Sequence, residues 1–436
     1  MKIMFVENKY KTLFWDKIAE YLIAEGHEIH WIIQNKLYTP SKGQRHLIKL
    51  PTKEELRYDP SYKELELKDR YSYVYGFKPL HYNYYQQKIE SILMLVKPDI
   101  VFGESTLFHE LLTIEVCKKK NILYLHPSTC RYPTNRFSFY QFDSLVPYGG
   151  SNEIWNDKVI EKVIKSIINR NSSPDYMKKE QSIGKLSFYM RRMKGLFGSL
   201  ISSNFLGEVY NTPTVSSKFR IEQDTKKNRN AYERIAIRNI DSFKKGNTII
   251  FPLQMQPESN LDVWGAPFNV QSDIISQIAD SLGEKWSILI KPNPKSKYEI
   301  SQALLDEIDA HPHVHALCHD ISMDVLFEKF DCFFSVTGTI NIECILAGKY
   351  CFSPKLPVNT MFTPELNCFP SLNAMNALRT DRDKMSPYAL INYLVSSSFS
   401  GMIGDQIHAP QVFSDSNIYN VVNAFKEIIR KKSSEV

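Results

Sequence analysis

The chain has 436 residues and a formal net charge of +6, and 43% of its residues are hydrophobic while 12% are aromatic. This composition excludes a disordered chain, and the length predicts two domains rather than one core. No run approaches the roughly 18 apolar residues of a membrane-spanning helix. The apolar run at residues 3–6 is too short for the core of a signal peptide, so the sequence predicts a cytoplasmic protein.

The first 150 residues alternate strand-like and helical patterns. Strands are expected at residues 3–7, 27–33, 99–104 and 121–127, and helices at residues 13–24 and 107–120, with a long loop after residue 33. This alternation is typical of βαβ units and a parallel sheet. Residues 1–170 are therefore expected to form a Rossmann-like domain.

Residues 171–245 are expected to form a basic, mainly helical connecting region. Between residues 178 and 245 there are 15 Lys or Arg against 6 Asp or Glu, so the positive charge is local. Residues 186–202 alternate apolar and basic side chains, a pattern suited to a helix on an anionic membrane surface. The same pattern also fits an ordinary solvated helix that packs on its own domain.

The alternation of strands and helices resumes at residue 247. Strands are expected at residues 248–254, 287–293, 313–319, 332–338 and 349–354, separated by helices at 273–282, 301–310, 322–330 and 340–348. Residues 246–400 are expected to form a second Rossmann-like domain, and residues 401–436 a helix that packs back across the domains. The predicted fold class is α/β, with two parallel sheets that face an interdomain cleft.

Polar side chains follow the predicted strands of both halves. In open α/β sheets, ligands bind at the carboxyl edge of the strands, where these residues are expected to gather. The first half contributes Glu7, Glu104, Ser105, His126 and Ser128, and the second half Gln254, Gln256, Glu258, Ser259, Lys291, Asn293, Thr337, Gly338 and Thr339. The abrupt change from the apolar strand TIIF to QMQPES indicates a core strand whose end forms one wall of a binding site.

The stretch SVTGTINIECILAGKY predicts a strand, a tight turn and a helix. First-turn amides of such a helix, with the hydroxyls of Thr337 and Thr339, suit a phosphate, and Gly338 lets the phosphate approach the backbone. Glu343, one turn into the helix, is placed to accept from ribose or sugar hydroxyls. Neither G-x-G-x-x-G nor a P-loop occurs. The alternative is a helix without a ligand, capped by a threonine and ending at Gly348, which fits the same residues.

Four charged residues at strand ends are candidates for chemistry. Lys291 can pair with a diphosphate or a carboxylate, or be a surface lysine before a turn. Glu258, Glu104 and Glu7 can act at the anomeric carbon of a sugar, where a carboxylate serves as nucleophile, base or electrostatic stabiliser. Each of these acids can equally be a helix cap or a solvent-exposed side chain.

The segment HPSTCRYPTNRF adds three candidates. His126 has a side chain suited to acid or base catalysis, although a His-Pro pair is also common in turns. Arg131 and Arg136 are candidates for binding an anionic group.

A metal site is not expected. His313 and His315 alternate along a predicted strand, and no H-E-x-x-H or C-x-x-C motif supports them. Asp381 and Asp383 follow no predicted strand, so they match a metal-diphosphate motif poorly. The sequence therefore predicts an enzyme without a cofactor or a bound metal.

The order of motifs in the second half resembles a known family. PLQMQPES, FNVQSDIISQIA, IKPNP and TGTINIECILAGK are similar to bacterial capsule polysaccharide biosynthesis proteins, which include β-Kdo and other nonulosonic-acid transferases. The likeness covers residues 247–355 and, more loosely, the GES and HPSTCR segments of the first half.

This resemblance implies a GT-B fold with a CMP-activated sugar acid bound by the second domain. The family motif Q-x-x-x-D-x-x-I is represented by Gln254, Glu258 and Leu261, which makes Glu258 the implied catalytic carboxylate. The motif K-x-H-P is represented by residues 291–294. Two positions depart from the family, because Glu258 replaces an Asp and Asn293 replaces a His.

The resulting hypothesis is a metal-independent glycosyltransferase that adds an acidic sugar such as Kdo to a bacterial capsule polysaccharide or lipopolysaccharide. Glu258, Glu104 and His126 are its expected catalytic residues. The basic region is expected to hold it at the inner face of the cytoplasmic membrane, where a glycan or lipid-linked glycan acceptor is found. The residues expected to bind this acceptor are Glu7, Ser105, Ser128, Arg131 and Arg136.

Two other hypotheses remain open. A UDP-sugar 2-epimerase also uses two Rossmann-like halves, and it predicts UDP binding and turnover without an acceptor. A non-catalytic glycan-binding or assembly subunit would keep the fold without the chemistry, and Asn293 favours it. Nucleic-acid binding is not expected, because the basic region lacks a recognised module.

Overall fold

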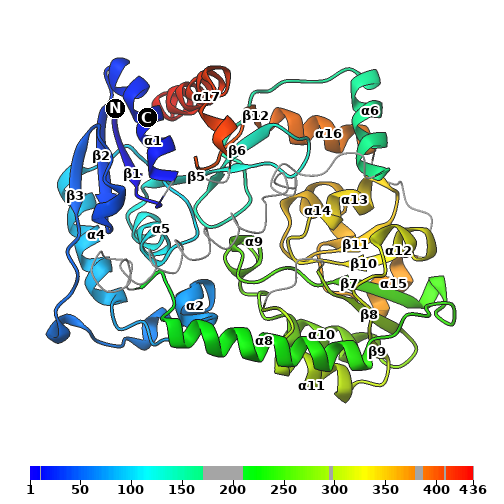
Figure 1. The fold of residues 1–436 in the computed structure, drawn as a ribbon. Helices are drawn as coiled ribbons and strands as arrows, with labels where there is room; N and C mark the ends of the chain where they lie inside the picture. Colours follow the sequence, from blue (N-terminus) through cyan, green and yellow to red (C-terminus); the bar gives the residue numbers. More distant parts are fainter. Residues whose placement is uncertain (10, 170–209, 294–297, 379–385, 407–408, 436) are drawn as a thin grey trace, which may run out of the picture. The chain divides into compact units, whose positions relative to one another are not determined.

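The computed structural model describes residues 1–9, 11–169, 210–293, 298–378, 386–406 and 409–435 (Figure 1). The chain divides into two compact units. Unit 1 comprises Met1–Val215 and Ile391–Val436, and unit 2 comprises Ser216–Leu390. Each unit is built around one sheet.

Unit 1 contains a seven-stranded sheet in the order β12-β6-β5-β4-β1-β2-β3. Strands β1 to β5 are mutually parallel, whereas β6 and β12 are antiparallel to their neighbours. Strand β1 is buried at four successive positions, as expected for a strand covered on both faces. The strands are β1 (Lys2–Val6), β2 (Glu28–Ile33), β3 (Gln44–Leu47), β4 (Ile100–Phe102), β5 (Leu123–Thr129), β6 (Arg136–Gln141) and β12 (Phe399–Ser400).

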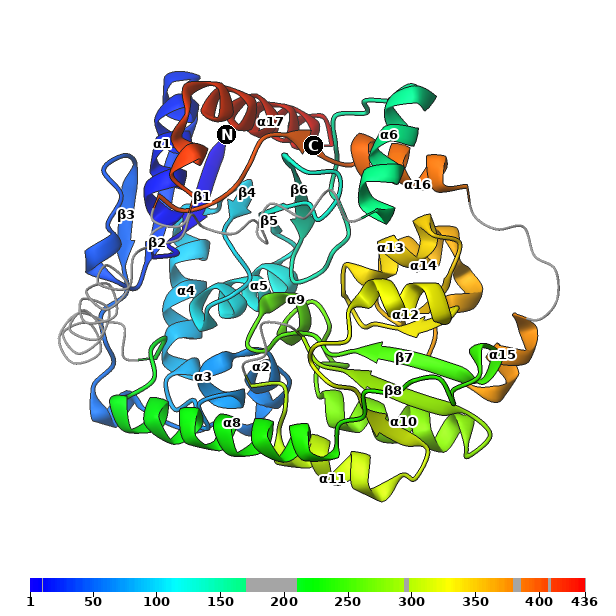
Figure 2. The same ribbon diagram turned by 45° about the vertical axis from the view of Figure 1, so that its right-hand side comes forward.

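The helices of unit 1 include one from the far end of the chain. Helix α17 packs beside α1 and shares a core with β1 and β2 (Figures 1 and 2). Its buried residues recur at helical spacing, from Ile418 through Phe425 to Ile429, which explains why this segment forms an amphipathic helix. The helices are α1 (Lys11–Ala24), α2 (Lys63–Lys68), α3 (Arg70–Tyr73), α4 (Tyr82–Val96), α5 (Phe108–Lys120), α6 (Asp157–Ile168) and α17 (Asp415–Ser434).

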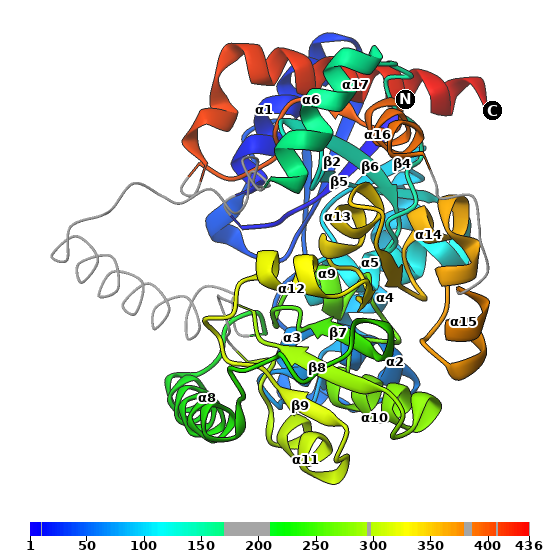
Figure 3. The ribbon, with the colours of Figure 1, turned by 90° about the vertical axis from the view of Figure 1, so that its right-hand side faces the viewer.

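Unit 2 contains a five-stranded, fully parallel sheet in the order β11-β10-β7-β8-β9. Alternate residues of β7 serve two cores: Ile249 and Phe251 contact the core that includes α10 and α11, and Ile250 contacts the core that includes α12 and α13. Figure 3 shows these helix pairs on opposite faces of the sheet. The strands are β7 (Thr248–Pro252), β8 (Ser287–Lys291), β9 (Val314–Ala316), β10 (Cys332–Phe334) and β11 (Tyr350–Phe352).

The helices around this sheet follow the chain order. They are α8 (Val215–Ile235), α9 (Ser259–Asp262), α10 (Gln271–Leu282), α11 (Gln302–Ala310), α12 (Met323–Lys329), α13 (Ile340–Leu346), α14 (Pro357–Phe362) and α15 (Leu372–Ala377). Helix α16 (Pro387–Ser396) carries the chain from unit 2 back into unit 1.

The predicted α/β class with two Rossmann-like sheets is confirmed. The parallel strands of each sheet have the same order, in which the first strand is central, two successive strands lie on one side and two on the other. The division of the chain differs from the expected domain boundaries. Residues 216–245 lie in unit 2 rather than in a connecting region, and the chain returns to unit 1 at Ile391.

Two local expectations need correction. The expected long loop after residue 33 contains β3, α2, α3 and α4. His126 and Ser128 lie within β5 rather than after it, because β6 pairs with β5 from Leu125 to Thr129 and extends the strand. The expected membrane-surface helix at residues 186–202 lies outside the described residues. Within the described part of the chain, no helix has the length and apolar character needed to cross a bilayer.

Candidate functional site

The candidate site in unit 2 lies at the centre of its sheet. From the central strand β7 the chain continues to β8 and β9 on one side, and later to β10 and β11 on the other. The connections that leave β7 and β10 therefore run in opposite directions from the carboxyl edge of the sheet. This place is the switch point, where open α/β sheets bind ligands. Residues 253–262 follow β7, and residues 335–339 follow β10.

Gln254 joins these two segments through its amide group. Its Oε1 accepts from the backbone N–H of Thr337 at 3.0 Å, and its Nε2 donates to the Thr337 hydroxyl at 2.9 Å. That hydroxyl donates to the carbonyl of Asn260 at 2.6 Å. Gln254 and Thr337 are both buried, so these bonds are strong and hold the turn after β10 onto the loop after β7.

Further hydrogen bonds connect Gln254 with Glu258. Gln271 accepts from the backbone N–H of Gln254 at 2.8 Å and donates to the Oε1 of Gln256 at 3.1 Å. Gln256 donates to Asp262 Oδ1 at 2.7 Å, and Asp262 Oδ2 accepts from the backbone N–H of Glu258 at 2.8 Å. We refer to the five side chains concerned as the glutamine network; they are Gln254, Gln256, Asp262, Gln271 and Thr337.

Glu258 precedes a single helical turn, α9. It occupies the N-cap position with extended backbone angles (φ −147°, ψ 132°), and its side chain makes no capping hydrogen bond. Both Glu258 and Ser259, the first residue of α9, are partly exposed. The glutamine network thus fixes the backbone of Glu258, while the carboxylate is not used to cap the helix.

Lys291 ends β8, next to the end of β7. Its ammonium is buried and donates to the carbonyls of Pro292 at 2.9 Å and His319 at 3.1 Å. Burial lowers the pKa of this ammonium, because the charged form loses its hydration. No carboxylate of the described residues forms an ion pair with Lys291, so its charge favours an anionic ligand. Asn293 is partly exposed and is the last described residue before position 298.

The turn before α13 is tightly packed. The N–H of Gly338 donates to the Ser335 hydroxyl at 2.9 Å, and a Cβ on Gly338 would lie 2.3 Å from that oxygen. The Thr337 hydroxyl, a candidate phosphate ligand, is occupied by the bonds to Gln254 and Asn260. Two polar side chains here are partly exposed: Thr339, at the N-cap of α13, and Glu343 in its first turn.

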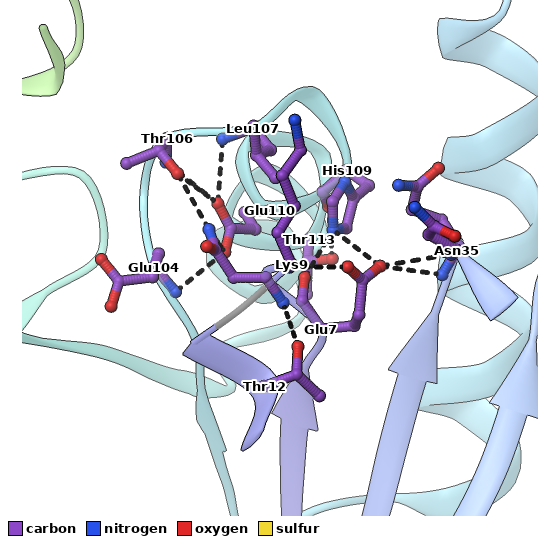
Figure 4. A network of polar contacts seen from close by, with 12 residues as sticks. Glu7, Lys9, Thr12, Asn35, Glu104, Thr106, Leu107, His109, Glu110 and Thr113 are labelled. Carbon is purple, nitrogen blue, oxygen red and sulfur yellow. Dashed lines mark hydrogen bonds and ion pairs between the residues drawn. The ribbon is translucent and has the colours of Figure 1, made fainter. Parts of the chain in front are cut away.

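A second polar cluster lies at the switch point of unit 1, where the chain leaves the central strand β1 (Figure 4). Glu7 is fully buried, and its carboxylate accepts from the backbone N–H of Lys9 at 2.8 Å and of Asn35 at 3.2 Å. Nε2 of His109 lies 2.7 Å from the carbonyl oxygen of Glu7. Glu7 therefore joins the ends of β1 and β2 to α5 and has no exposed surface for a ligand.

Glu110 completes this cluster from the first turn of α5. Its carboxylate accepts from the side chain of Asn8 at 2.8 Å, and from the backbone N–H groups of Glu104, Thr106 and Leu107 at 2.9 to 3.1 Å. The Thr106 hydroxyl adds a fifth bond at 2.9 Å. Burial raises the pKa of the Glu110 carboxyl, and these five donors oppose that shift. Glu110 thus fixes the loop that follows β4 (Figure 4).

Glu104, at the end of β4, is paired with a lysine. Its carboxylate forms an ion pair of 2.9 Å with Lys11, whose side chain is partly exposed. Burial raises the pKa of Glu104 and the Lys11 charge lowers it, with a net upward shift. The neighbouring Ser105 is almost fully buried. The structure therefore brings Glu7, Glu104 and Ser105 to one edge of the sheet.

The remaining candidates of unit 1 lie on the β5–β6 hairpin. His126 is buried, with Nδ1 2.6 Å from the carbonyl of Phe142, and burial lowers its pKa to about 4. Ser128 faces Ser138 in the ladder and is partly exposed, as is Arg131 in the turn that follows. These three residues belong to the hairpin and not to the loops after β1 and β4 that carry Glu7 and Glu104.

Arg136 links β6 to the returning C-terminal segment. Its Nε donates to the Ser398 hydroxyl at 2.8 Å, and its Nη2 donates to the carbonyls of Val395 and Ser398, both at 2.9 Å. Its Nη1 forms an ion pair of 2.8 Å with Glu153. The guanidinium is buried, so its contacts are those of a residue that holds the fold.

Three residues with central positions were not among the sequence candidates. They are Asp262 and Gln271 in unit 2, and Glu110 in unit 1. Glu110 carries a recognisable signal, because an acid at the third position of a helix is typical of a capping box. Asp262 and Gln271 carry no such signal, since their partners are brought near only by the folded loop. No group of three or more His, Cys, Asp or Glu side chains among the described residues could hold a metal ion.

One comparison, with a family model, concerns mainly unit 2. Residues 210–353 match the family model described as capsule polysaccharide biosynthesis protein. A search among curated proteins finds no match. Among solved structures, the chain is similar to UDP-GlcNAc 2-epimerase from Methanocaldococcus jannaschii, with 12% identity, a TM-score of 0.26, and coverage of 90% of this chain and 97% of that chain.

It is also similar to KpsC, a β-Kdo 2,7 transferase from Thermosulfurimonas dismutans. The identity is 10%, the TM-score is 0.37, and the alignment covers 97% of this chain and 99% of that chain. Both likenesses are too distant to carry an argument about activity. The match over residues 210–353 includes all five members of the glutamine network. Over these residues the chain therefore matches the capsule polysaccharide biosynthesis family, which confirms the resemblance seen in its motifs.

Proposed function

We propose that the protein is a glycosyltransferase of bacterial capsule or surface-polysaccharide synthesis, and that unit 2 binds its nucleotide-sugar donor. The observation that carries this proposal is the position of the glutamine network. It lies at the switch point of the parallel sheet, inside the segment that matches the capsule polysaccharide biosynthesis family. Glu258 is held at the rim of this network with a partly exposed side chain.

The donor phosphate would be bound by Lys291 and by the turn before α13. Lys291 is a buried cation that, among the described residues, donates to the backbone carbonyls of Pro292 and His319, so a phosphate would neutralise its charge. Thr339 would contribute its hydroxyl, and Gly338 a close backbone approach. Thr337 would act indirectly, because its hydroxyl holds the turn in place.

Glu258 would act at the anomeric carbon of the donor. A glycosyl transfer passes through an oxocarbenium-like state, which a nearby carboxylate can stabilise or attack. The donor class that the sequence resemblance implies is a CMP-activated sugar acid such as Kdo or another nonulosonate. This chemistry would need no metal ion, since the charge of the leaving phosphate would be matched by Lys291.

Acceptor binding is proposed for unit 1, on the side of Glu104 and Ser105. Glu104 has a raised pKa and a lysine partner, which suits an acid or base that exchanges a proton with an acceptor hydroxyl. His126 would serve only if it becomes accessible, since it is buried and neutral. Arg136 is not included in this proposal because its guanidinium is bound within unit 1.

A thermal-shift screen with CMP, UDP, GDP and ADP tests the donor class. A nucleotide that binds the folded state stabilises it by mass action, by about 2.7 kcal/mol at 100 times its Kd. The proposal predicts a rise of the melting temperature with CMP and none with the other three. A response to UDP together with conversion of UDP-GlcNAc in the absence of acceptor would instead identify a 2-epimerase.

Transfer is then tested with CMP-Kdo and lipid-linked glycan as acceptor, using the wild-type chain and Glu258→Gln. The variant is expected to bind CMP normally and to lose transfer. If glycan assembly in cells survives this substitution, the protein is a non-catalytic assembly subunit and the proposal is wrong.

A further inference from the structure

Lys11 is a cation beside the candidate acid of unit 1. Helix α1 begins at Lys11, shortly after the end of β1. The Lys11 ammonium lies 2.9 Å from Oε1 of Glu104. The Lys11 side chain is 28% exposed, whereas that of Glu104 is 7% exposed. The pair therefore joins a partly exposed cation to a nearly buried acid.

The position of Lys11 in α1 is unfavourable for the helix itself. The first turn of a helix carries a partial positive charge, so acids stabilise it and cations do not. The first turn of α1 contains Lys11 and no acid. The start of the helix is held instead by Asn8, whose backbone N–H donates to the Thr12 hydroxyl at 2.9 Å. Helix stability therefore does not account for a lysine here, whereas the pairing with Glu104 does.

The groups around Glu104 act on its charge in opposite directions. Burial raises the pKa of the Glu104 carboxyl, the Lys11 charge lowers it, and the charge of Glu110 raises it. The backbone of Glu104 is held on two sides: its N–H donates to Glu110 at 3.1 Å (Figure 4), and its carbonyl accepts from Tyr124 of β5 at 2.5 Å. Lys11 therefore favours the carboxylate form of Glu104 against both burial and Glu110.

The charge of Lys11 also acts on His126. Burial is the main cause that lowers the pKa of His126 to about 4, and the Lys11 charge lowers it further. The carbonyl of Phe142 and the charge of Asp143 oppose this shift. Lys11 therefore favours the carboxylate of Glu104 and the neutral ring of His126, which are the forms of these two side chains that accept protons.

We propose that Lys11 is a positioning residue for acceptor activation, because its ammonium holds Glu104 as the carboxylate that takes the proton of the acceptor hydroxyl. This inference rests on the proposed function, in which Glu104 exchanges a proton with the acceptor. The acceptor oxygen forms a bond to the anomeric carbon while its proton passes to Glu104. The bond from that carbon to the leaving oxygen breaks, and this oxygen, of the CMP phosphate or of Glu258 after a covalent step, keeps the bonding pair. Lys11 exchanges no proton in this step.

The pH dependence of kcat/KM for the acceptor tests this role in Lys11→Met. A general base works above its pKa, so transfer is lost as the pH falls through the pKa of Glu104. Removal of an adjacent positive charge is expected to move the midpoint of this loss up by about 1–3 pH units and to leave the high-pH plateau within about 2-fold of the wild-type value. Lys11→Arg keeps the charge and should keep the wild-type midpoint. The matched control is Lys17→Met, which removes the same charge from an exposed ion pair of α1 and should change neither value.

Two results of the pH profile would overturn the proposal. One is an unchanged midpoint in folded Lys11→Met. The other is a fall of kcat/KM by the same factor at every pH, which would mean that Lys11 only maintains the fold. If Lys11→Met does not fold, Lys11→Gln keeps an N–H donor without the charge, and the same rise of the midpoint is expected.

A second readout does not depend on activity. Carbon-13 NMR of chains labelled at the glutamate carboxyl carbons follows the titration of Glu104, whose signal is identified by its loss in Glu104→Gln. The midpoint of this titration should also rise in Lys11→Met, and an equal midpoint in the two proteins overturns the proposal whether or not transfer is observed. If the midpoint rises but the wild-type chain transfers no Kdo, the proposed function fails, and with it the role of this pair in acceptor activation.

Discussion

Gln254 illustrates why amide side chains are needed at the end of β7. Its oxygen accepts from the N–H of Thr337 while its nitrogen donates to the hydroxyl of the same residue. Both bonds require a group that carries a donor and an acceptor side by side. A carboxylate has acceptors only, so it cannot make both bonds. Gln256 and Gln271 use their amides in the same double way. The amide side chains after β7 therefore join the loops of unit 2 to one another.

The packing around Gly338 leads to a prediction at this scale. A Cβ at this position would lie 2.3 Å from the Ser335 hydroxyl, which also accepts the N–H of Gly338. Gly338→Ala is therefore expected to lower the free energy of unfolding by about 1–3 kcal/mol, as overpacking does, and to weaken CMP binding. Urea denaturation measures the first effect. Gly246→Ala is the control, because a Cβ there meets no atom within 4 Å; equal effects of the two substitutions would contradict this account.

Some residues of the candidate site could be predicted from the sequence, and others could not. Gln254, Gln256 and Thr337 could be located because they follow strands that read clearly as apolar runs. Asp262 and Gln271 could not, since each reaches its partner Gln256 only when the loop after β7 folds back onto α10. The Thr337 hydroxyl likewise reaches its partner, the carbonyl of Asn260, only in the folded structure. Thr337, which was expected to bind phosphate, therefore has a structural role.

At the scale of elements, helices and strands with a regular apolar pattern were predicted from the sequence, and elements without such a pattern were not. Helix α17 and strand β7 have buried positions at regular spacing, which the apolar pattern reveals. Strand β3 has no fully buried residue, so its sequence carries no apolar signal. The extension of β5 depends on pairing with β6, and that pairing is a long-range contact that a local pattern cannot report.

The link between β6 and the C-terminal segment gives a prediction for an element. Arg136→Met removes the charged donor of the Val395 and Ser398 carbonyls, which keep only neutral donors such as Ser151, and a hydrogen bond to a charged group contributes about 1.5–3 kcal/mol. The variant is therefore expected to lose about 3 kcal/mol of stability in urea denaturation. Arg57→Met, at an exposed position, is the control and should lose little. A stability equal to that of the control would show that this link is unimportant.

At the scale of the whole molecule, the chain repeats one plan. In each unit the first strand has two parallel strands on either side of it, and a polar cluster lies at the switch point. The cluster of unit 1 is built on the carboxylates of Glu7 and Glu110, and that of unit 2 on amides. The sequence predicts both sheets because alternating strands and helices leave few other solutions. It predicts a final helix that packs back across the domains, but not the contact of this helix with α1, which joins the two ends of the chain.

The stability of unit 1 is expected to depend on pH through a buried histidine. His81 stacks on Tyr210 with 3.8 Å between ring centroids, and burial lowers its pKa to about 3. The unfolded chain binds the proton near pH 6.5, so between pH 6.5 and 3 it carries more protons than the folded chain. This contribution to stability is therefore present above pH 6.5 and is lost as the pH falls, by about 1.4 kcal/mol per pH unit.

The substitution His81→Phe keeps the stacked ring and removes the titration. Relative to this variant, the wild-type chain should lose about 2 kcal/mol of stability between pH 6.5 and pH 5. Urea denaturation of both proteins at several pH values measures the difference. Two curves that run parallel over this range would show that His81 is not held neutral by burial.

The central claim is that the switch point of unit 2 binds the phosphate of a CMP-activated donor, and calorimetric titration of CMP into the wild-type chain, Lys291→Met and Lys285→Met tests it most directly. Lys285 is exposed and precedes the same strand, so it is the matched control. Because a hydrogen bond to a charged group contributes about 1.5–3 kcal/mol, the account predicts a Kd at least tenfold higher for Lys291→Met and an unchanged Kd for Lys285→Met. Equal CMP affinity in all three proteins, or no binding to the wild-type chain, would contradict it.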